Sequence, residues 1–211
     1  MYIAIDGVIG AGKTSLARLL QPAFDAELLL EVFEENPFLS DFYSDRARYA
    51  FQTQVFFVLS RYQQQQRAVP DALARGSLIA DYTFAKDALF ARINLHGDEL
   101  HMYYRLHDAL ADKIPPPELV VYLRASTDAL MQRIALRARV YERRMERAYI
   151  DALNHAYDEF FADHRQSPVL TIETQGLDFV SNPEDLHSVA SRIREALGLG
   201  AYQAPLPLGE A

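Results

Sequence analysis

Residues 7–14 read Gly7-Val8-Ile9-Gly10-Ala11-Gly12-Lys13-Thr14, a complete G-x-x-x-x-G-K-[ST] phosphate-binding pattern. The preceding segment, residues 1–6, is short, apolar and β-prone, as a buried parallel strand should be. The following segment, residues 15–20, has helical composition. A strand, this loop and then a helix is the context in which such a pattern binds phosphate groups.

Each part of this loop has an expected role. Glycines let backbone N–H groups curl around a triphosphate, and the helix N-terminus directs partial positive charge at it. Lys13 is expected to reach the β- and γ-phosphates, and Thr14 to offer its hydroxyl to Mg²⁺. The residues expected to bind the nucleotide here are Gly7, Gly10, Ala11, Gly12, Lys13, Thr14 and Ser15.

The composition indicates one globular domain. The chain has 211 residues, of which 50% are hydrophobic. Its net charge of −8 argues against broad binding to nucleic acid or to anionic membranes. Apolar runs such as residues 55–59 are too short to span a membrane, and we expect no signal peptide. The absence of cysteine fits a cytoplasmic protein.

The remaining sequence alternates between strand-like and helix-like segments, which predicts an α/β fold with a parallel sheet covered on both faces. We expect a single domain over residues 1–197, followed by a loose tail over residues 198–211. Further strands are expected at residues 27–31, 77–81, 118–123 and 169–172. Helices are expected at residues 38–43, 46–69 (ending at Pro70), 85–113 (broken near 96–98), 127–136 and 144–164, with a last one starting at Asn182-Pro183.

A cluster of arginines follows the fourth expected strand. Arg133 and Arg137 are one helical turn apart on one face, and Arg139 enters a loop. Such a cluster suits a mobile lid that closes positive charge over a transferring phosphoryl group. A solvated basic helix face is the alternative, which the negative net charge and the phosphate loop disfavour. The GTPase patterns D-x-x-G and N-K-x-D are absent from the sequence.

Several motifs in order resemble the deoxynucleoside kinase family, from residue 1 to about residue 197. They are the phosphate loop, the segments E-V-F-E-E-N-P-F-L (31–39), F-Q-T-Q to S-R (51–61) and I-A-D-Y-T-F-A-K-D (79–87), and the arginine lid. The runs 79–82 and 141–149 look most like the bacterial deoxyguanosine and deoxyadenosine kinases. The resemblance implies a P-loop NTPase fold with a five-stranded parallel sheet and an arginine-rich lid.

Two acidic residues are placed at strand ends, where ligands meet doubly wound sheets. The resemblance makes Glu31 the general base for the nucleoside 5′-hydroxyl; a strand-end surface charge or a helix-capping carboxylate is the alternative. Asp81 is expected to bind Mg²⁺ through water. In many relatives an arginine follows this acid, but Tyr82 stands here, so one expected cation is missing. Val32 replaces the proline that usually follows the base.

The resemblance also implies a nucleoside site. Gln54 and Arg61 are two helical turns apart on one face. Gln54 would pair with the base, and Arg61 would pair with Asp87 and present both side chains to the base. Tyr43 and Glu142 would bind the sugar 3′-hydroxyl and leave no room for a 2′-hydroxyl. Three aromatic residues could sandwich the base or belong to the core: Phe56, Phe57 and Phe84.

The phosphate donor would lie on the other side of the loop. Arg133 would stack on the adenine of ATP. Arg137 and Arg139 would stabilise charge on the γ-phosphoryl oxygens opposite Lys13, which makes Glu31, Lys13, Arg137 and Arg139 the expected catalytic set. Asp178 and Phe179 are placed where a loop for the donor base is expected.

The resulting interpretation is a kinase that uses ATP and Mg²⁺ to phosphorylate purine deoxynucleosides in nucleotide salvage, with deoxyguanosine favoured over deoxyadenosine. A nucleoside monophosphate kinase of the thymidylate type and a non-catalytic ATP-binding module are the alternatives. The aromatic helices at residues 46–69 and 85–113 predict a homodimer, which the family resemblance also implies.

Overall fold

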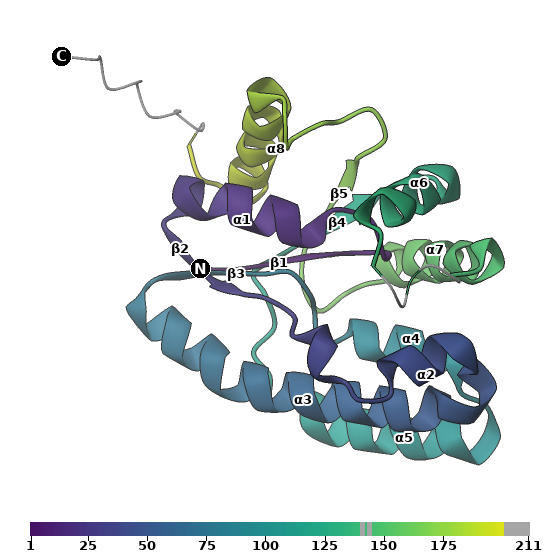
Figure 1. Cartoon of the computed structure of the whole chain (residues 1–211). Helices are drawn as coiled ribbons and strands as arrows, with labels where there is room; N and C mark the ends of the chain where they lie inside the picture. Colours follow the sequence, from purple (N-terminus) through teal and green to yellow (C-terminus); the bar gives the residue numbers. More distant parts are fainter. Residues whose placement is uncertain (140–141, 143–144, 201–211) are drawn as a thin grey trace.

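The computed structural model describes residues 1–139, 142 and 145–200 (Figure 1). Five parallel strands form one sheet in the order β2-β3-β1-β4-β5. The strands are β1 (Tyr2–Gly7), β2 (Ala26–Leu29), β3 (Ser77–Ala80), β4 (Leu119–Arg124) and β5 (Val169–Glu173). The helices are α1 (Lys13–Phe24), α2 (Leu39–Ser44), α3 (Arg46–Arg75), α4 (Lys86–Asn94), α5 (Gly97–Ala111), α6 (Thr127–Arg137), α7 (Arg147–Ala162) and α8 (Pro183–Ala196), with a 3₁₀ turn, η1 (Phe33–Glu35).

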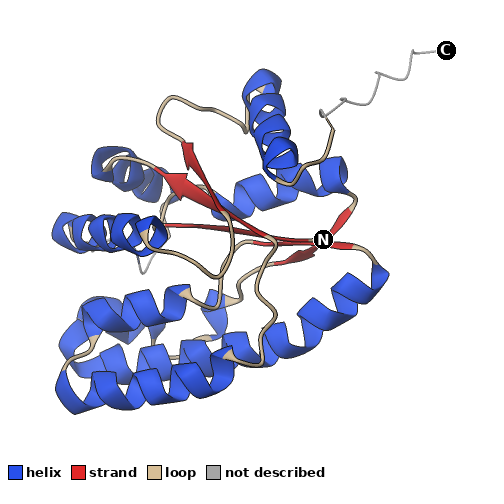
Figure 2. Cartoon of the chain, turned by 180° about the vertical axis from the view of Figure 1, so that it is seen from behind, coloured by secondary structure: helices blue, strands red, loops and turns tan. Residues whose placement is uncertain are grey.

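Helices cover both faces of the sheet (Figures 1 and 2). α1 and α8 lie together on one face, while α3, α4 and α5 pack against each other on the opposite side. The predicted α/β fold with a five-stranded parallel sheet is therefore confirmed. No helix in the described part of the chain has both the length and the hydropathy that a membrane crossing requires.

The central strand sets the position of the phosphate loop. All six residues of β1 are buried, as predicted for an inner strand of a parallel sheet. β1 pairs with β3 through Ala4 and Ala80, and with β4 through Ile5 and Val121. Since parallel strands end at the same edge, the loop after β1 lies beside the segment that follows β3.

Some predicted boundaries are wrong. β2 ends at Leu29, so Glu31 lies in the following loop and not in the strand. α3 does not end at Pro70 but continues to Arg75. Val69 and Ala72 are buried against β2 and β3, and this packing keeps the helix intact although the proline removes one backbone donor.

The other helices follow the prediction closely. The expected break near residues 96–98 separates α4 from α5. α8 begins at Pro183, and the Asn182 side chain accepts a hydrogen bond from the N–H of Glu184. The first residue of the helix expected at 144–164 lies outside the described residues, and α7 begins at Arg147. Most of the expected tail, residues 201–211, is also outside them.

A buried carboxylate joins three elements at the end of β1. Asp6 is fully buried, and its Oδ1 accepts hydrogen bonds from the N–H of Gly7 (2.8 Å) and the hydroxyl of Tyr157 on α7 (3.1 Å). Its Oδ2 accepts from the hydroxyl (2.5 Å) and the N–H (3.2 Å) of Thr83. Thr83 Oγ1 in turn accepts from the N–H of Lys86 at the start of α4 (3.2 Å). This network fixes the phosphate loop relative to α4 and α7.

We predict that Asp6→Asn lowers the free energy of unfolding by about 3 kcal/mol, because it removes a buried charge that four donors satisfy. Urea unfolding measures this change. The matched control is Asp71→Asn on the exposed side of α3, which should stay within about 0.5 kcal/mol of the parent chain. Equal effects of the two substitutions would contradict a structural role for the Asp6 network.

Candidate active site

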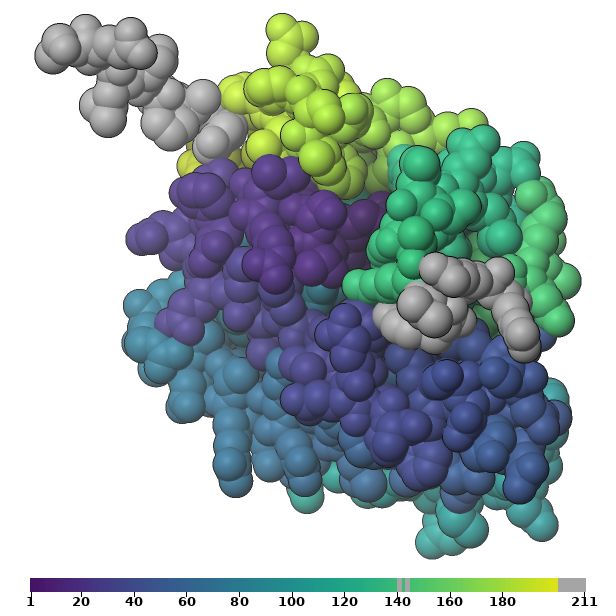
Figure 3. All heavy atoms as spheres, in the orientation of Figure 1, coloured from purple at the N-terminus to yellow at the C-terminus, as the bar shows by residue number. Residues whose placement is uncertain are grey.

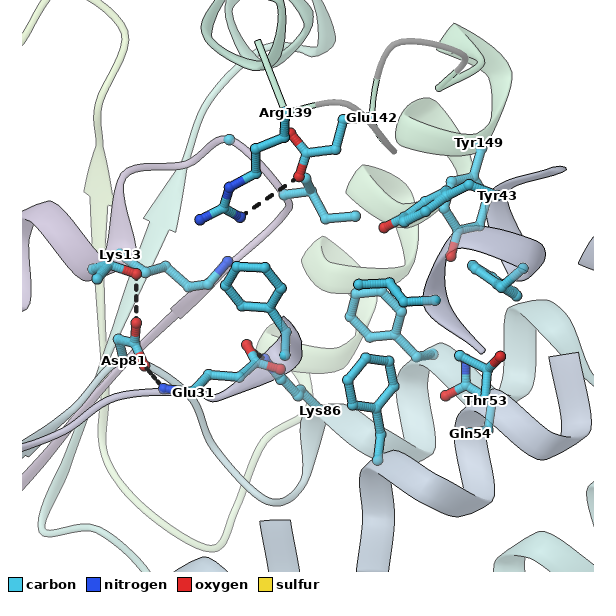
Figure 4. Close-up of a pocket in the computed structure, with 18 of the residues that line it drawn as sticks. Lys13, Glu31, Tyr43, Thr53, Gln54, Asp81, Lys86, Arg139, Glu142 and Tyr149 are labelled. Carbon is cyan, nitrogen blue, oxygen red and sulfur yellow. Dashed lines mark hydrogen bonds and ion pairs between the residues drawn. The ribbon is translucent and has the colours of Figure 1, made fainter. Parts of the chain in front are cut away.

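A cavity opens at the carboxyl ends of the strands, between the phosphate loop and the helices α2, α3, α4 and α7 (Figure 4). Figure 4 shows Lys13 and Asp81 at one side of it and Thr53 and Gln54 at the other, with Glu31 and Lys86 between. The structure thus brings many of the predicted residues together. Those that line it are Gly10, Lys13, Thr14, Glu31, Tyr43, Gln54, Phe57, Arg61, Asp81, Arg137, Arg139 and Glu142.

A second cavity lies on the other side of the phosphate loop. Its walls are residues 10–15, Arg133, Arg137, Arg139 and the loop over residues 177–180. Figure 3 shows purple, green and blue segments, from the N-terminus, α6 and α2, meeting on one face of the molecule. Five residues line both cavities: Gly10, Lys13, Thr14, Arg137 and Arg139. A phosphoryl group held by these five residues could therefore be reached from either cavity.

The phosphate loop has its lysine folded back onto the backbone. Lys13 Nζ donates to the carbonyl oxygens of Gly7 (2.7 Å) and Val8 (3.1 Å). Burial, together with the nearby charge of Lys86, lowers the pKa of Lys13 to about 8. Gly7 itself lines neither cavity. A Cβ at Gly7 would lie 2.5 Å from the carbonyl oxygen of Leu123, so this position requires glycine for close approach to β4.

Two side chains with oxygen atoms that can bind a metal ion lie where the metal ion is expected. Thr14 Oγ1 donates to Asp81 Oδ2 (2.5 Å), and Asp81 Oδ1 accepts from the N–H of Glu31 (2.7 Å). A hydroxyl and a carboxylate fit Mg²⁺, which takes few protein ligands and completes its shell with water and substrate phosphates. The described residues contain no group of three or more His, Cys, Asp or Glu side chains that could hold a metal ion alone. This donor set fits a metal that arrives with a nucleotide.

Glu31 lies between two cations. Its Oε1 accepts from Arg61 on α3, and its Oε2 accepts from Lys86 Nζ on α4 (2.6 Å). Arg61 also pairs with Asp87, as predicted, but Asp87 is fully buried and does not line the cavity. Burial alone would raise the pKa of the Glu31 carboxyl, but Arg61 and Lys86 outweigh burial and hold that pKa well below its ordinary range. Glu31 is therefore an ionised acceptor in the neutral range.

The expectation of a missing cation near Glu31 is wrong, because Lys86 supplies it. Lys86 is 4% exposed and lines the cavity. Sequence reasoning missed this residue, although it stands inside the quoted run 79–87, one position before Asp87. Tyr82 has a different role, because its hydroxyl donates to Gln64 Oε1 (2.6 Å) and Gln64 Nε2 donates to the carbonyl of Leu30 (2.9 Å).

The arginines expected to form a lid are tied to Glu142. Arg137 bonds to both carboxylate oxygens of Glu142 (3.1 and 2.5 Å), and Arg139 lies 3.7 Å from one of them. The Arg139 guanidinium also lies over the ring of Phe33 (4.2 Å to the centroid). Tyr43 lines the same cavity as Glu142 (Figure 4). Residues 140–141 and 143–144 of this segment lie outside the described residues.

The three aromatic residues considered for the base divide between site and core. Phe57 lines the cavity beneath the Arg61 guanidinium (4.4 Å to the ring centroid). Phe84 does not line it: its ring is 7% exposed and stacks on His107 of α5 (5.0 Å). The loop after Asp81 turns Phe84 toward the α5 side, so its predicted contact with the base is wrong. Phe56 does not line the cavity either.

The second cavity contains the residues predicted for the phosphate donor. Arg133 lines it, and the Arg133 guanidinium donates hydrogen bonds to the side-chain oxygen of Thr174 (2.9 Å) and to the carbonyl oxygen of Thr174 (2.7 Å). Phe179 is 7% exposed and packs against Gly12, where a Cβ would lie 3.0 Å from Phe179 Cζ. Asp178 Oδ1 accepts hydrogen bonds from the N–H groups of the two residues that follow Phe179. These contacts place the loop after β5 over the phosphate loop.

The fold and the paired cavities define a nucleotide-dependent phosphotransferase of the P-loop class. The family model for deoxynucleoside kinase matches residues 3–198, and the chain belongs to this family. The chain is 33% identical to the deoxyguanosine kinase of Bacillus subtilis (strain 168), over 93% of this chain and 97% of that protein. It is 36% identical to the deoxyadenosine kinase of Dictyostelium discoideum, over 88% of this chain and 76% of that protein.

A solved structure has the same fold. The deoxyadenosine kinase from M. mycoides with bound dATP superposes with a TM-score of 0.79 at 24% identity, over 92% of this chain and 99% of that chain. Family membership makes the chain a kinase that acts on nucleosides. It speaks against the two alternatives, a nucleoside monophosphate kinase and a non-catalytic ATP-binding module.

We predict that affinity for ATP falls as the pH rises above about 8. The free Lys13 loses its proton there, whereas a bound triphosphate raises the pKa of Lys13 and must recover that proton on binding. Below pH 8 Lys13 is protonated, so its ionisation should not change the affinity for ATP. Above pH 8 the affinity should fall by up to about tenfold per pH unit.

Calorimetric titration with ATP between pH 7 and 9.5 measures this dependence. Lys13→Arg is the control, because a guanidinium stays protonated across the range and should remove the pH dependence. An affinity for the parent chain that does not change from pH 7 to 9.5 would contradict the assignment to Lys13.

Proposed function

We propose that this chain transfers the γ-phosphoryl group of ATP to the 5′-hydroxyl of a purine deoxynucleoside, with deoxyguanosine favoured and deoxyadenosine next. The observation that carries the proposal is the common wall of the two cavities, formed by the phosphate loop with Arg137 and Arg139. A donor in one cavity and an acceptor in the other would meet at this wall. Glu31 lies on the acceptor side only.

The chemistry follows from that arrangement. The nucleoside 5′-oxygen attacks the γ-phosphorus, its proton passes to Glu31, and the bond from phosphorus to the β,γ-bridging oxygen breaks to release ADP. Lys13, Arg137 and Arg139 stabilise the charge on the transferring group. Thr14 and Asp81 would hold Mg²⁺, which neutralises charge on the β- and γ-phosphates when bound.

The far end of the acceptor cavity suits a base. Gln54 is 2% exposed there, and its amide offers a donor and an acceptor to a purine edge. Thr53 beside it has a buried hydroxyl without a hydrogen-bond partner among the described residues. Tyr43 and Glu142 also line this cavity, and the sugar would lie against them with its 3′-hydroxyl. Phe57 provides an apolar ring for the base.

The preference for purines rests on the relatives. The proteins from Bacillus subtilis and Dictyostelium discoideum described above are named deoxyguanosine kinase and deoxyadenosine kinase, and both match most of this chain. A role in cytoplasmic nucleotide salvage fits this acceptor, because a free deoxynucleoside is a breakdown product of nucleotides.

We predict that Glu31→Gln lowers kcat for the preferred deoxynucleoside by about 10²–10⁴-fold, because the amide cannot accept the proton. Phosphate transfer from ATP·Mg²⁺ should be measured for all four deoxynucleosides and for the corresponding monophosphates. Glu27→Gln is the matched control, since Glu27 pairs with Arg75 on the surface and should leave the rate unchanged. Transfer to monophosphates alone, or ATP binding without transfer, would refute the proposal.

The same proposal includes a homodimer formed through the outer faces of α3 and α5. Leu59 on α3 and Met102 on α5 are 41% and 62% exposed, and the two helices contact each other. Exposed apolar side chains on adjacent helices are typical of a subunit interface. α3 and α5 lie on the side of the molecule away from α1 and α8 (Figure 1).

We predict that the parent chain sediments as a dimer at micromolar concentration and that Leu59→Glu with Met102→Glu converts it to a monomer, because each charge would be buried in the interface. Analytical ultracentrifugation measures the mass. Leu136→Glu on α6 is the control, since this residue is 85% exposed outside α3 and α5. A monomeric parent chain would exclude the proposed dimer.

A further inference from the structure

A buried lysine outside the predicted catalytic set contacts the proposed base. Lys86 is 4% exposed, and its Nζ lies 2.6 Å from Glu31 Oε2. Its N–H donates to Thr83 Oγ1, which belongs to the Asp6 network, so the first turn of α4 is fixed relative to the phosphate loop. Withdrawing an ammonium group from water is costly unless a partner compensates it. Glu31 is that partner.

We propose that Lys86 is the positioning residue that fixes the Glu31 carboxylate for proton transfer, in place of an arginine after Asp81. The inference rests on the proposed function and extends it to a residue outside the expected catalytic set. Lys86 acts through Glu31 and need not touch the substrate.

Arg61 alone does not fix the carboxylate. Its guanidinium contacts Glu31 through Oε1 only, and its remaining amino group pairs with the buried Asp87. The second oxygen, Oε2, receives its hydrogen bond from Lys86. A carboxylate held at one oxygen can rotate about its terminal bond, whereas one held at both oxygens by different helices cannot. Lys86 therefore determines which oxygen faces the acceptor.

The contacts of Tyr82 explain why the cation beside Glu31 comes from position 86 and not from position 82. Its hydroxyl is bonded to Gln64, which also holds the carbonyl of Leu30, the residue directly before Glu31. The Tyr82 ring lies 5.4 Å from Lys86 Nζ. An arginine side chain at position 82 would start close to the space that this ammonium group occupies. Position 82 thus holds the backbone of the Glu31 loop, and position 86 provides the cation.

The test begins with Lys86→Met, which keeps the length of the side chain and removes its charge. We expect kcat for the preferred deoxynucleoside to fall on the order of 100-fold, because a small misplacement of a reacting group has effects of that size. The KM for ATP should change less than threefold, since Lys86 lines only the acceptor cavity. Lys113→Met is the matched control and should retain full activity, because Lys113 is exposed.

Rescue separates positioning from general damage. Lys86→Arg should recover at least tenfold of the lost kcat, and so should Tyr82→Arg combined with Lys86→Met, because each returns a cation to the same side of Glu31. Tyr82→Arg alone reports the cost of losing the contact with Gln64. An unchanged kcat in Lys86→Met, or a loss that neither cationic variant restores, would overturn the proposal.

A second readout does not depend on activity. With ¹³C-labelled glutamate, and Glu31→Gln to assign the signal, NMR at pH 7 follows the carboxyl carbon of Glu31. The groups that face it are Lys13, Arg61, Asp81, Tyr82, Lys86 and Tyr157. In Lys86→Met the Glu31 signal should move to a different chemical shift, because the carboxylate loses the hydrogen bond from the ammonium group, while Lys113→Met should leave it in place.

The two readouts distinguish the two hypotheses. A parent chain that phosphorylates none of the deoxynucleosides would refute the proposed function, and the NMR signal would still decide whether Lys86 holds Glu31. A Glu31 carboxyl signal with the same chemical shift in Lys86→Met and in the parent chain would overturn the positioning role, whatever the activity. A shifted Glu31 carboxyl signal together with a reduced and rescuable kcat is the expected result.

Discussion

The hydrogen bonds to the buried carboxylate of Asp6 are the constraint on which the arrangement of the site depends. They join the first residue of the phosphate loop to Tyr157 of α7 and to Thr83. The Thr83 hydroxyl oxygen in turn accepts a hydrogen bond from a backbone N–H in the first turn of α4. A carboxylate that is buried away from water is stable only while its hydrogen-bond donors stay in contact with it. The loop that binds phosphate and the helix that carries Lys86 are therefore fixed to the same point.

Charge in the site is local and mostly compensated. The chain carries a net charge of −8, yet the wall shared by the two cavities contributes Lys13, Arg137 and Arg139. These cations contact backbone carbonyls or the carboxylate of Glu142. An anionic ligand must therefore compete with those contacts, because these cations already have partners. This organisation favours ligands with several negative charges over singly charged anions.

Much of the fold could be predicted because its signals are local. The phosphate loop has fixed spacing, and β1 and β3 are short apolar runs. The loop that contains Lys13 follows β1, and Asp81 directly follows β3. Lys86 was missed because its partner, Glu31, is 55 positions away and only the packing of α4 brings them together. Phe84 was misplaced since a loop gives no periodicity from which to read its direction. α3 passes Pro70 because tertiary packing outweighs the local effect of proline.

The length of α3 has an evolutionary consequence. Its 30 residues correspond to about 45 Å of continuous helix, with Gln54 and Arg61 in the cavity wall and Ala72 against the sheet. Inserting or deleting one residue between Gln54 and Ala72 would turn one end by about 100° relative to the other. Either the cavity or the sheet would then lose its contacts. Homologous chains should therefore keep the residue count of this stretch constant even where its side chains differ.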